Sequence, residues 1–202
     1  MNSDCTSKTL YQSVTACPGQ KAKPGIRRRI FYVPKIGIAV WPVLNDVGET
    51  SATMGDLAKY KGDFSLADGT FFQSLDLKPE ASNVTFETVG ERGSELFNNQ
   101  LNAIFAGQPD ALKGFARQAV SDDIVYIVQQ KDGSFVVVGN EAFETKTAPS
   151  GDTGAESTGS TTSTFAINCY DECPIPTYVG KLQISETEQY DCATGKVEKI
   201  SA

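Results

Sequence analysis

The residues of this chain that could do chemistry are carboxylates, thiols and hydroxyls, because the sequence contains no histidine. Two carboxylate pairs, Asp122-Asp123 and Asp171-Glu172, have the residue type used in acid–base catalysis and in metal binding. Neither pair has a partner acid or a metal framework nearby, so we interpret them as a solvated helix end and a solvated turn. Without imidazole, catalytic triads and many general bases are missing, and the serines lack an activating base. We therefore predict that the chain is not an enzyme.

The thiols and glycines of the chain do not have the spacing of a metal or cofactor site. The spacing of Cys169, Cys173 and Cys192 is not that of a zinc knuckle or ribbon, and an odd number of cysteines without a secretion signal favours reduced thiols. The glycines of the 151–159 segment lack the strand-glycine-helix context that a phosphate cradle requires. We predict no metal and no cofactor. The five cysteines of the chain are Cys5, Cys17, Cys169, Cys173 and Cys192.

Length and composition describe a globular chain with a substantial core. It has 202 residues, of which 40% are hydrophobic and 21% are charged. No apolar run approaches the roughly 18 to 20 residues that span a bilayer. The first residues lack the basic and apolar regions of a signal peptide. These observations predict a protein that is made in a cytoplasm and has no membrane partner.

Charge is distributed unevenly along the chain. Residues 1–60 carry eight Lys and Arg against four Asp and Glu, a net charge of +4, and residues 61–202 carry ten against twenty-one, a net charge of −11. A basic segment on an acidic body suits head-to-tail contact between copies of one chain. Binding of nucleic acid through the body is disfavoured, since affinity for phosphate rests on Lys and Arg. We interpret the basic cluster Arg27-Arg28-Arg29 first as the charged start of a strand.

The pattern of apolar residues predicts a mainly β fold, a β-sandwich or barrel, with one packed helix. We divide the chain into an N-terminal arm at 1–25, a β domain at 26–184 and a C-terminal extension at 185–202. The Gly, Ser and Thr-rich stretch 144–163 has no large apolar side chain, which predicts a long flexible loop. The expected helix spans 109–119. The expected strands are 26–33, 36–41, 64–66, 71–77, 83–89, 94–106, 124–130, 134–139, 164–168, and short pieces around 178–184 and 196–200.

The segment 84–105 is predicted to form a long hairpin. Val84, Phe86 and Thr88 alternate with Thr85, Glu87 and Val89, which is the period of a half-buried strand, and a glycine-containing turn at 90–93 follows. The next segment is ambiguous, because Phe97 and Leu101 are four apart, as on a helix, and also fit a period of two. We favour the return strand of the hairpin. Lys131-Asp132-Gly133 predicts a second, tighter hairpin between 124 and 139.

The order of these segments resembles virion structural proteins of tailed phages that infect Bacteroidota. The resemblance runs from Pro24-Gly-Ile-Arg-Arg-Arg-Ile-Phe-Tyr-Val-Pro34 through Trp41-Pro42, the hairpin with Gly90-Glu-Arg-Gly93, the 109–119 helix, the 124–139 hairpin and the strand 164–168. It covers roughly residues 24–183 and leaves out the arm and the C-terminal region. It implies a tail-tube-like fold in which subunits form a ring, a hexamer or a dodecamer, beside other tail, neck or portal proteins. It also implies that DNA passes through the ring as cargo and is not a bound partner.

Physical reasoning points to assembly as well. A long hairpin of modest apolar content cannot bury both faces within its own domain and must find a partner sheet. If six copies formed a ring, a number that the resemblance implies, they would carry six times −7, or −42, which would repel DNA from a channel wall. The alternative function is a β-sandwich module that recognises glycan or protein through its aromatic side chains. The residues predicted to contact other copies are Val84, Phe86, Thr88, Phe97, Leu101, Arg27, Arg28 and Arg29.

Overall fold

The protein is described from a computed structural model, which places residues 11–15, 18–19, 21–45, 53–157 and 159–200. Within these residues the chain is mainly β with a single α-helix, as predicted. Cys5 and Cys17 and most of the N-terminal arm lie outside the described residues. The described residues of the arm before residue 25 are exposed and belong to no strand or helix.

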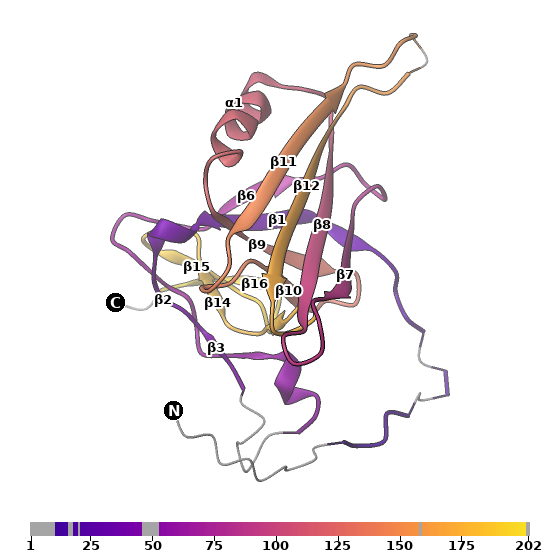
Figure 1. Ribbon diagram of the computed structural model, residues 1–202. Coiled ribbons are helices and arrows are strands. Elements are labelled where there is room, and N and C mark those ends of the chain that lie inside the picture. Colours follow the sequence, from indigo (N-terminus) through magenta and orange to yellow (C-terminus); the bar gives the residue numbers. More distant parts are fainter. Residues whose placement is uncertain (1–10, 16–17, 20, 46–52, 158, 201–202) are drawn as a thin grey trace.

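A five-stranded antiparallel sheet forms the centre of the molecule (Figure 1). Its middle strand is buried on both faces, because alternate residues enter two different cores. Tyr126 and Val128 enter one cluster of buried side chains, the first core, and Val125 and Ile127 enter another, the second core. The near-continuous apolar run of this strand is typical of a strand covered on both sides. In spatial order the sheet contains β13 (Thr177–Tyr178), β10 (Phe135–Val138), β9 (Ile124–Gln130), β1 (Ile26–Pro34) and β6 (Gln73–Asp76).

A four-stranded antiparallel sheet covers one face of the central sheet, and Figure 1 shows its strands crossing those of β1 and β9 at a steep angle. Leu101, Phe165 and Ile167 project from it into the first core. The helix α1 (Asp110–Ala119) packs on the same side, where the Phe115 and Phe165 rings stack at 5.7 Å between centroids. In spatial order the strands are β11 (Thr145–Asp152), β12 (Thr162–Asp171), β8 (Leu96–Ala106) and β7 (Asn83–Val89).

The opposite face of the central sheet is covered by short strands and aromatic side chains. Phe64 contacts Trp41, Phe72 and Tyr178 in a cluster of tilted and edge-on rings. The elements on this side are η1 (Lys35–Gly37), η2 (Asp56–Ala58), the pair β2 (Ile38–Val40) and β5 (Ser65–Leu66), the pair β3 (Val43–Leu44) and β4 (Tyr60–Lys61), and a three-stranded sheet of β14 (Lys181–Gln183), β15 (Glu188–Asp191) and β16 (Lys196–Lys199).

Both predicted hairpins are confirmed. Strands β7 and β8 pair over seven residues, from Asn83 with Asn102 to Val89 with Leu96, so the ambiguous segment is a return strand. The turn between them needs a glycine at position 90, which has a φ of 95°, and a Cβ there would lie 2.5 Å from the Ser94 carbonyl oxygen. The helix begins one residue later than expected, with Pro109 as its N-cap residue.

Three predictions about elements are wrong. The stretch 144–163 is not a loop, because 145–152 forms β11, which pairs with β12 over eight residues in a hairpin that projects from the body (Figure 1). Its threonines are β-branched and suit a strand, and its lack of large apolar residues reflects solvent around the projecting part. The predicted strand 36–41 begins with the helical turn η1. The predicted boundary at residue 184 divides the three-stranded sheet, since Leu182 and Tyr190 pack on one core.

Candidate functional site

The four-stranded sheet has two open edges. Within the described residues β7 pairs only with β8, and β11 pairs only with β12. An open edge carries a row of unpaired N–H and C=O groups, which is a template for pairing with another strand. Because the sheet is antiparallel and has four strands, its two edge strands run in opposite directions. We call this pair of edges, β7 and β11, the candidate assembly surface.

Hydrogen bonds show which backbone groups face the edge of β11. The Thr145 N–H donates to Asp123 Oδ1 at 2.9 Å, so it points away from β12. Backbone groups alternate sides along an antiparallel strand, so Thr147, Pro149 and Gly151 also face the open edge. Proline has no N–H, which is tolerated on an edge strand for the same reason. The edge of β11 therefore offers the N–H groups of Thr147 and Gly151 and the C=O groups of all three residues.

Hydrogen bonds also show which backbone groups of β7 face its open edge. The Ile104 carbonyl accepts from Lys78 N–H, and its N–H donates to Ser82 Oγ, so the even-numbered residues of β8 point toward the β7 side. Their partners on β7, such as Asn83 and Thr85, are therefore used within the chain. The backbone groups of Val84, Phe86 and Thr88 are left facing solvent.

The structure brings five of the predicted contact residues together and separates the three arginines from them. Phe86 and Phe97 are neighbours, with ring centroids 6.2 Å apart, and Phe86 is 53% exposed. Thr88 is exposed, and Val84 is half-buried against the first core. Leu101 is 1% exposed inside that core. This side chain, expected to contact another copy, is therefore already buried by its own chain.

The arginines lie on β1, in the central sheet. Arg27, Arg28 and Arg29 are all exposed, and Arg29 Nε lies 3.1 Å from Asp76 Oδ1 on β6. Both partners of this ion pair are more than half exposed, so it is a surface contact of small energetic weight. The predicted reading of the cluster as the charged start of a strand is confirmed.

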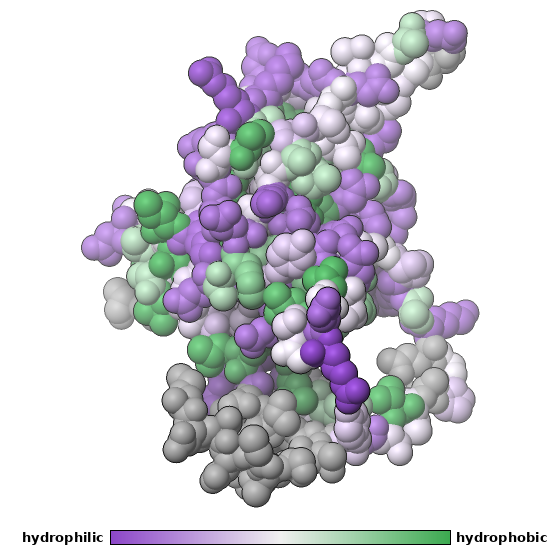
Figure 2. Space-filling model, viewed as in Figure 1, coloured by the Kyte–Doolittle hydropathy of each residue, from purple (hydrophilic) through white to green (hydrophobic). Residues whose placement is uncertain are grey.

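The face of the four-stranded sheet that points away from the core is polar and mostly uncharged. Asn98, Gln100 and Asn102 of β8 lie beside Asn168 and Ala166 of β12. Charged side chains on this face occur at its edges and end, at Glu87, Lys146 and Asp152. Figure 2 shows mainly hydrophilic and intermediate colours on the projecting part of the molecule. Such a face presents amides and hydroxyls with little net charge.

A groove of about 450 Å³ lies between α1 and the β11 edge. We call it the helix groove and define it by Leu112, Ala116, Val120, Pro149, Gly151 and Phe165. Its lining also includes polar residues, among them the basic side chains of Lys113 and Arg117. Val120 is 61% exposed, so one wall of the groove is an uncovered apolar side chain.

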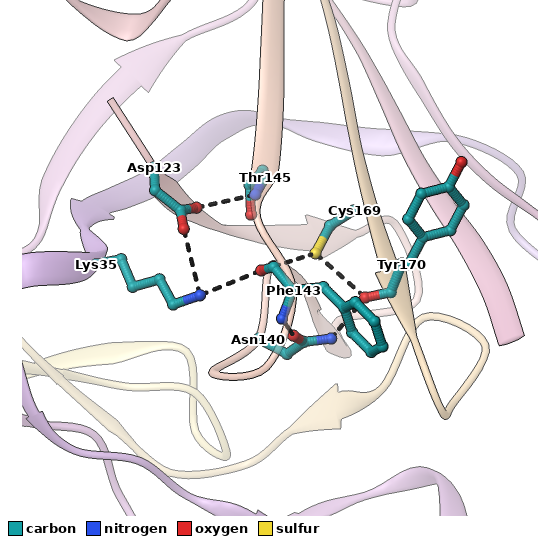
Figure 3. A network of polar contacts seen from close by, with 7 residues as sticks. All are labelled: Lys35, Asp123, Asn140, Phe143, Thr145, Cys169 and Tyr170. Carbon is teal, nitrogen blue, oxygen red and sulfur yellow. Dashed lines mark hydrogen bonds and ion pairs between the residues drawn. The ribbon is translucent and has the colours of Figure 1, made fainter. Parts of the chain in front are cut away.

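A polar network fixes the start of β11 against the central sheet (Figure 3). Lys35 Nζ lies 3.2 Å from Asp123 Oδ2 and donates to the Phe143 carbonyl at 3.1 Å. Asn140 holds the preceding turn, accepting from Phe143 N–H at 2.8 Å and donating to the Tyr170 carbonyl at 2.7 Å. The expectation that Asp123 belongs to a solvated helix end is wrong, because it joins η1, β9 and β11.

A second cavity, of about 290 Å³, lies beside this network and is lined by aromatic and acidic residues. We call it the acidic cleft, and its lining includes Trp41, Tyr60, Phe143, Glu141, Asp171 and Glu172. Asp171 is 3% exposed, so its interpretation as part of a solvated turn is also wrong. Burial raises the pKa of this carboxyl, and its Oδ2 atom has no hydrogen-bond partner among the described residues.

The three described cysteines are buried free thiols, and two of them belong to the cores. Cys169 lies in the first core and Cys192 in the second, so they are not neighbours in one site. Burial raises the pKa of each thiol, that of Cys173 to about 11, which keeps it protonated and unreactive. Within the described residues no group of three or more His, Cys, Asp or Glu side chains could hold a metal ion.

Sequence reasoning missed the β11 edge, the helix groove and the anchoring role of Asp123. The edge had a signal, because Thr145, Thr147 and Pro149 alternate with Lys146 and Ala148 at a period of two. The groove had none, since it forms only where α1 meets β11. No helix among the described residues is long and apolar enough to cross a membrane.

Comparison with known protein families, with curated proteins and with solved structures found no match for this chain. The resemblance to phage tail proteins therefore stays a prediction that rests on the order of the sequence segments.

Proposed function

We propose that the chain is a non-enzymatic structural protein of a phage virion, which assembles with copies of itself into a ring or tube in the tail or neck. The observation that supports assembly is the pair of open edges on the four-stranded sheet. The assignment to a virion, and to neighbours such as portal, neck and other tail proteins, comes from the sequence resemblance alone.

Head-to-tail joining of these edges can continue around a ring. When copies are related by rotation about one axis, β7 of one copy meets β11 of the next. We call this pairing of β7 with β11 of the next copy the joint. The two strands run in opposite directions, so the joint is antiparallel, like every pairing within the sheet. A closed ring leaves no edge exposed, which removes the aggregation hazard of an open sheet.

The number of strands sets the width of the ring. Six copies of a four-stranded sheet would give six times four, or 24, strands. Closed sheets of roughly 16 to 18 strands already leave an aqueous channel, and diameter grows with strand number. With α1 and the central sheet outside, the amide-rich face would line the channel. Its lack of clustered Lys and Arg would let DNA pass without being held.

Replacing Thr88 by proline tests the assembly. The Thr88 N–H faces the open edge of β7 and has no acceptor in the part of the chain that the structure describes, so Thr88→Pro should leave the monomer folded and prevent rings. Light scattering after size-exclusion chromatography and electron microscopy measure assembly, and thermal unfolding measures the monomer. A wild-type chain that stays monomeric at high concentration, or is absent from purified virions, contradicts the proposal.

One observation favours a second function, recognition of a glycan or protein by a β module. The acidic cleft combines Trp41, Tyr60 and Phe143 with the carboxylates of Glu141 and Glu172. Aromatic walls with a few polar groups are typical of ligand sites. Binding to a glycan array by a stable monomer, lost in Trp41→Ala, would favour this function over assembly.

A further inference from the structure

Phe86 is an apolar side chain that the chain does not bury. It projects from β7 on the same face as Val84, which packs on the first core, but it lies on the edge strand and is 53% exposed. Its one aromatic neighbour among the described residues is Phe97, at 6.2 Å between ring centroids. Fully burying a phenylalanine gains about 1.5–3 kcal/mol relative to exposure, so an exposed ring on an open edge is suited to a partner.

The helix groove lies on the same face of the same sheet, at its opposite edge. Pro149 and Phe165, which are paired across β11 and β12, line it. Pro149 lies on the same face of β11 as Thr145 and Thr147, which are buried on the core side. A strand added to β11 would place every second side chain on this face, next to the groove. The groove and the exposed ring are therefore on the two surfaces that head-to-tail joining brings together.

The hydrogen-bond pattern restricts the register of such a joint. The residues facing outward are Val84, Phe86 and Thr88 on one edge and Thr147, Pro149 and Gly151 on the other, and outward-facing residues must oppose each other. Pairing of β7 ends at Lys146, because the outward N–H of Thr145 is already bonded to Asp123. One register satisfies both conditions and uses all seven residues of β7, running from Asn83 opposite Asp152 to Val89 opposite Lys146.

Ring geometry requires the stagger that this register contains. Within one copy, Phe86 is level with Thr145 across the sheet, through Asn99 and Cys169. In the register between copies, Phe86 lies opposite Pro149 instead. Pro149 is four residues along β11 from Thr145, a shift of about 14 Å at the rise of a strand. Four strands spaced about 4.8 Å apart span about 19 Å, so the strands would tilt by about 36°, within the roughly 35–45° of closed sheets. An unstaggered joint would overlap only residues 83–86 with 145–148.

We propose that β7 of one copy pairs with β11 of a second copy in this register, with Phe86 opposite Pro149 and its ring in the helix groove. The inference rests on the proposed assembly and names its joint. Three outward-facing pairs would exchange six backbone hydrogen bonds, and the missing N–H of Pro149 removes one of them. Thr88 then lies opposite Thr147, and Glu87 lies diagonal to Lys146, both favourable cross-strand pairs.

Photochemical cross-linking from position 86 tests the joint. Phe86 is replaced by the photoreactive benzoylphenylalanine in one isotopically labelled batch, which is mixed with unlabelled chain, assembled and irradiated. Cross-linked peptides should join position 86 of one copy to Pro149 or to the 112–120 segment of the other. Rings whose adducts lie elsewhere would overturn this joint and leave assembly standing. A wild-type chain that forms no rings would overturn both.

A matched pair of substitutions gives an independent readout. Phe86→Asp places a charge in the groove and should weaken assembly at least about tenfold, which corresponds to about 1.4 kcal/mol. Val120→Asp, on the opposite wall, should weaken it in the same direction. Val197→Asp is the control, because Val197 on β16 is also 53% exposed but lies away from both edges. Equal effects of Phe86→Asp and Val197→Asp on assembly, measured by light scattering, would contradict the joint.

Discussion

Asp171 is the residue whose environment differs most from its expected one. Its Oδ1 accepts the Cys173 N–H at 3.1 Å, while Oδ2 has no partner among the described residues and the side chain is almost completely buried. Burial disfavours the charged form and raises the pKa above the ordinary value of 3.8. The folded chain therefore holds a proton on Asp171 at a pH where the unfolded chain has released it.

This difference gives a pH dependence with a definite sign. Between pH 3.8 and the raised pKa, the folded state binds more protons than the unfolded state, so the free energy of unfolding falls as the pH rises. Above that interval the loss is constant. Asp171→Asn does not titrate, so its free energy of unfolding relative to wild type should increase from pH 4 toward neutrality. Chemical denaturation at several pH values measures it, with the exposed-site variant Asp68→Asn as control.

A relative stability of Asp171→Asn that is flat or falls across this interval would show that the carboxylate gains more from its hydrogen bonds than it loses by burial.

Single residues also show what the sequence could predict about the candidate site. Alternation correctly placed Val84 and Phe86 on one face of their strand, and the structure shows Leu101 on the same face of the hairpin. It could not tell that Leu101 is enclosed by the chain while Phe86 is exposed, because alternation gives the face and not the place where the core ends. Asp123 was missed because its partners, Lys35 and Thr145, are distant in sequence.

At the scale of elements, local patterns predicted most strands and failed where composition and tertiary context disagree. The β7–β8 hairpin has an alternating first strand and a glycine turn, the β9–β10 hairpin has two apolar strands around an Asp-Gly turn, and both were predicted. Strand β11 is rich in Thr, Ser and Gly and resembles a linker, yet it is paired along its whole length with β12. Strand β15, Glu188–Asp191, was missed because its four residues show no apolar alternation.

The anchor of β11 should matter more for stability than a surface ion pair. Lys35 and Asp123 are less than a third exposed, and Asp123 also accepts the Thr145 N–H. Asp123→Ala leaves that N–H and the Lys35 ammonium without their partner, so we expect a loss of about 2–4 kcal/mol in the free energy of unfolding. Denaturant unfolding measures the loss, and hydrogen exchange of the 143–152 segment should rise.

The control for this prediction is Asp76→Ala, which removes the exposed ion pair with Arg29 on β1. Exposed pairs contribute about 0–1 kcal/mol, so this variant should be close to wild type. If Asp76→Ala and Asp123→Ala destabilise the protein equally, the network of Figure 3 is not an anchor.

At the scale of the whole molecule, the sequence could predict that the hairpin needs partners but not which edge would receive them. Counting charges suggested a basic N-terminal segment meeting an acidic body of another copy. The structure instead offers a joint of backbone hydrogen bonds and one aromatic ring, with Arg27 and Arg28 on a different sheet. An open edge is a property of the finished sheet, which explains why local patterns could not locate it.

The two kinds of contact predict opposite effects of salt. Each copy carries a net charge of −7, so copies repel one another, and an apolar, hydrogen-bonded joint should strengthen when salt screens that repulsion. We expect the assembled fraction to rise between about 0.05 M and about 1 M NaCl, as the screening length falls to about 3 Å. Sedimentation measures it. Changing all three arginines at 27–29 to glutamine makes the charge −7 − 3 = −10, so this variant should need more salt to assemble. Two results would show that opposite charges hold the copies together instead. The rings would dissociate as the salt concentration rises, and salt would not restore assembly of the arginine variant.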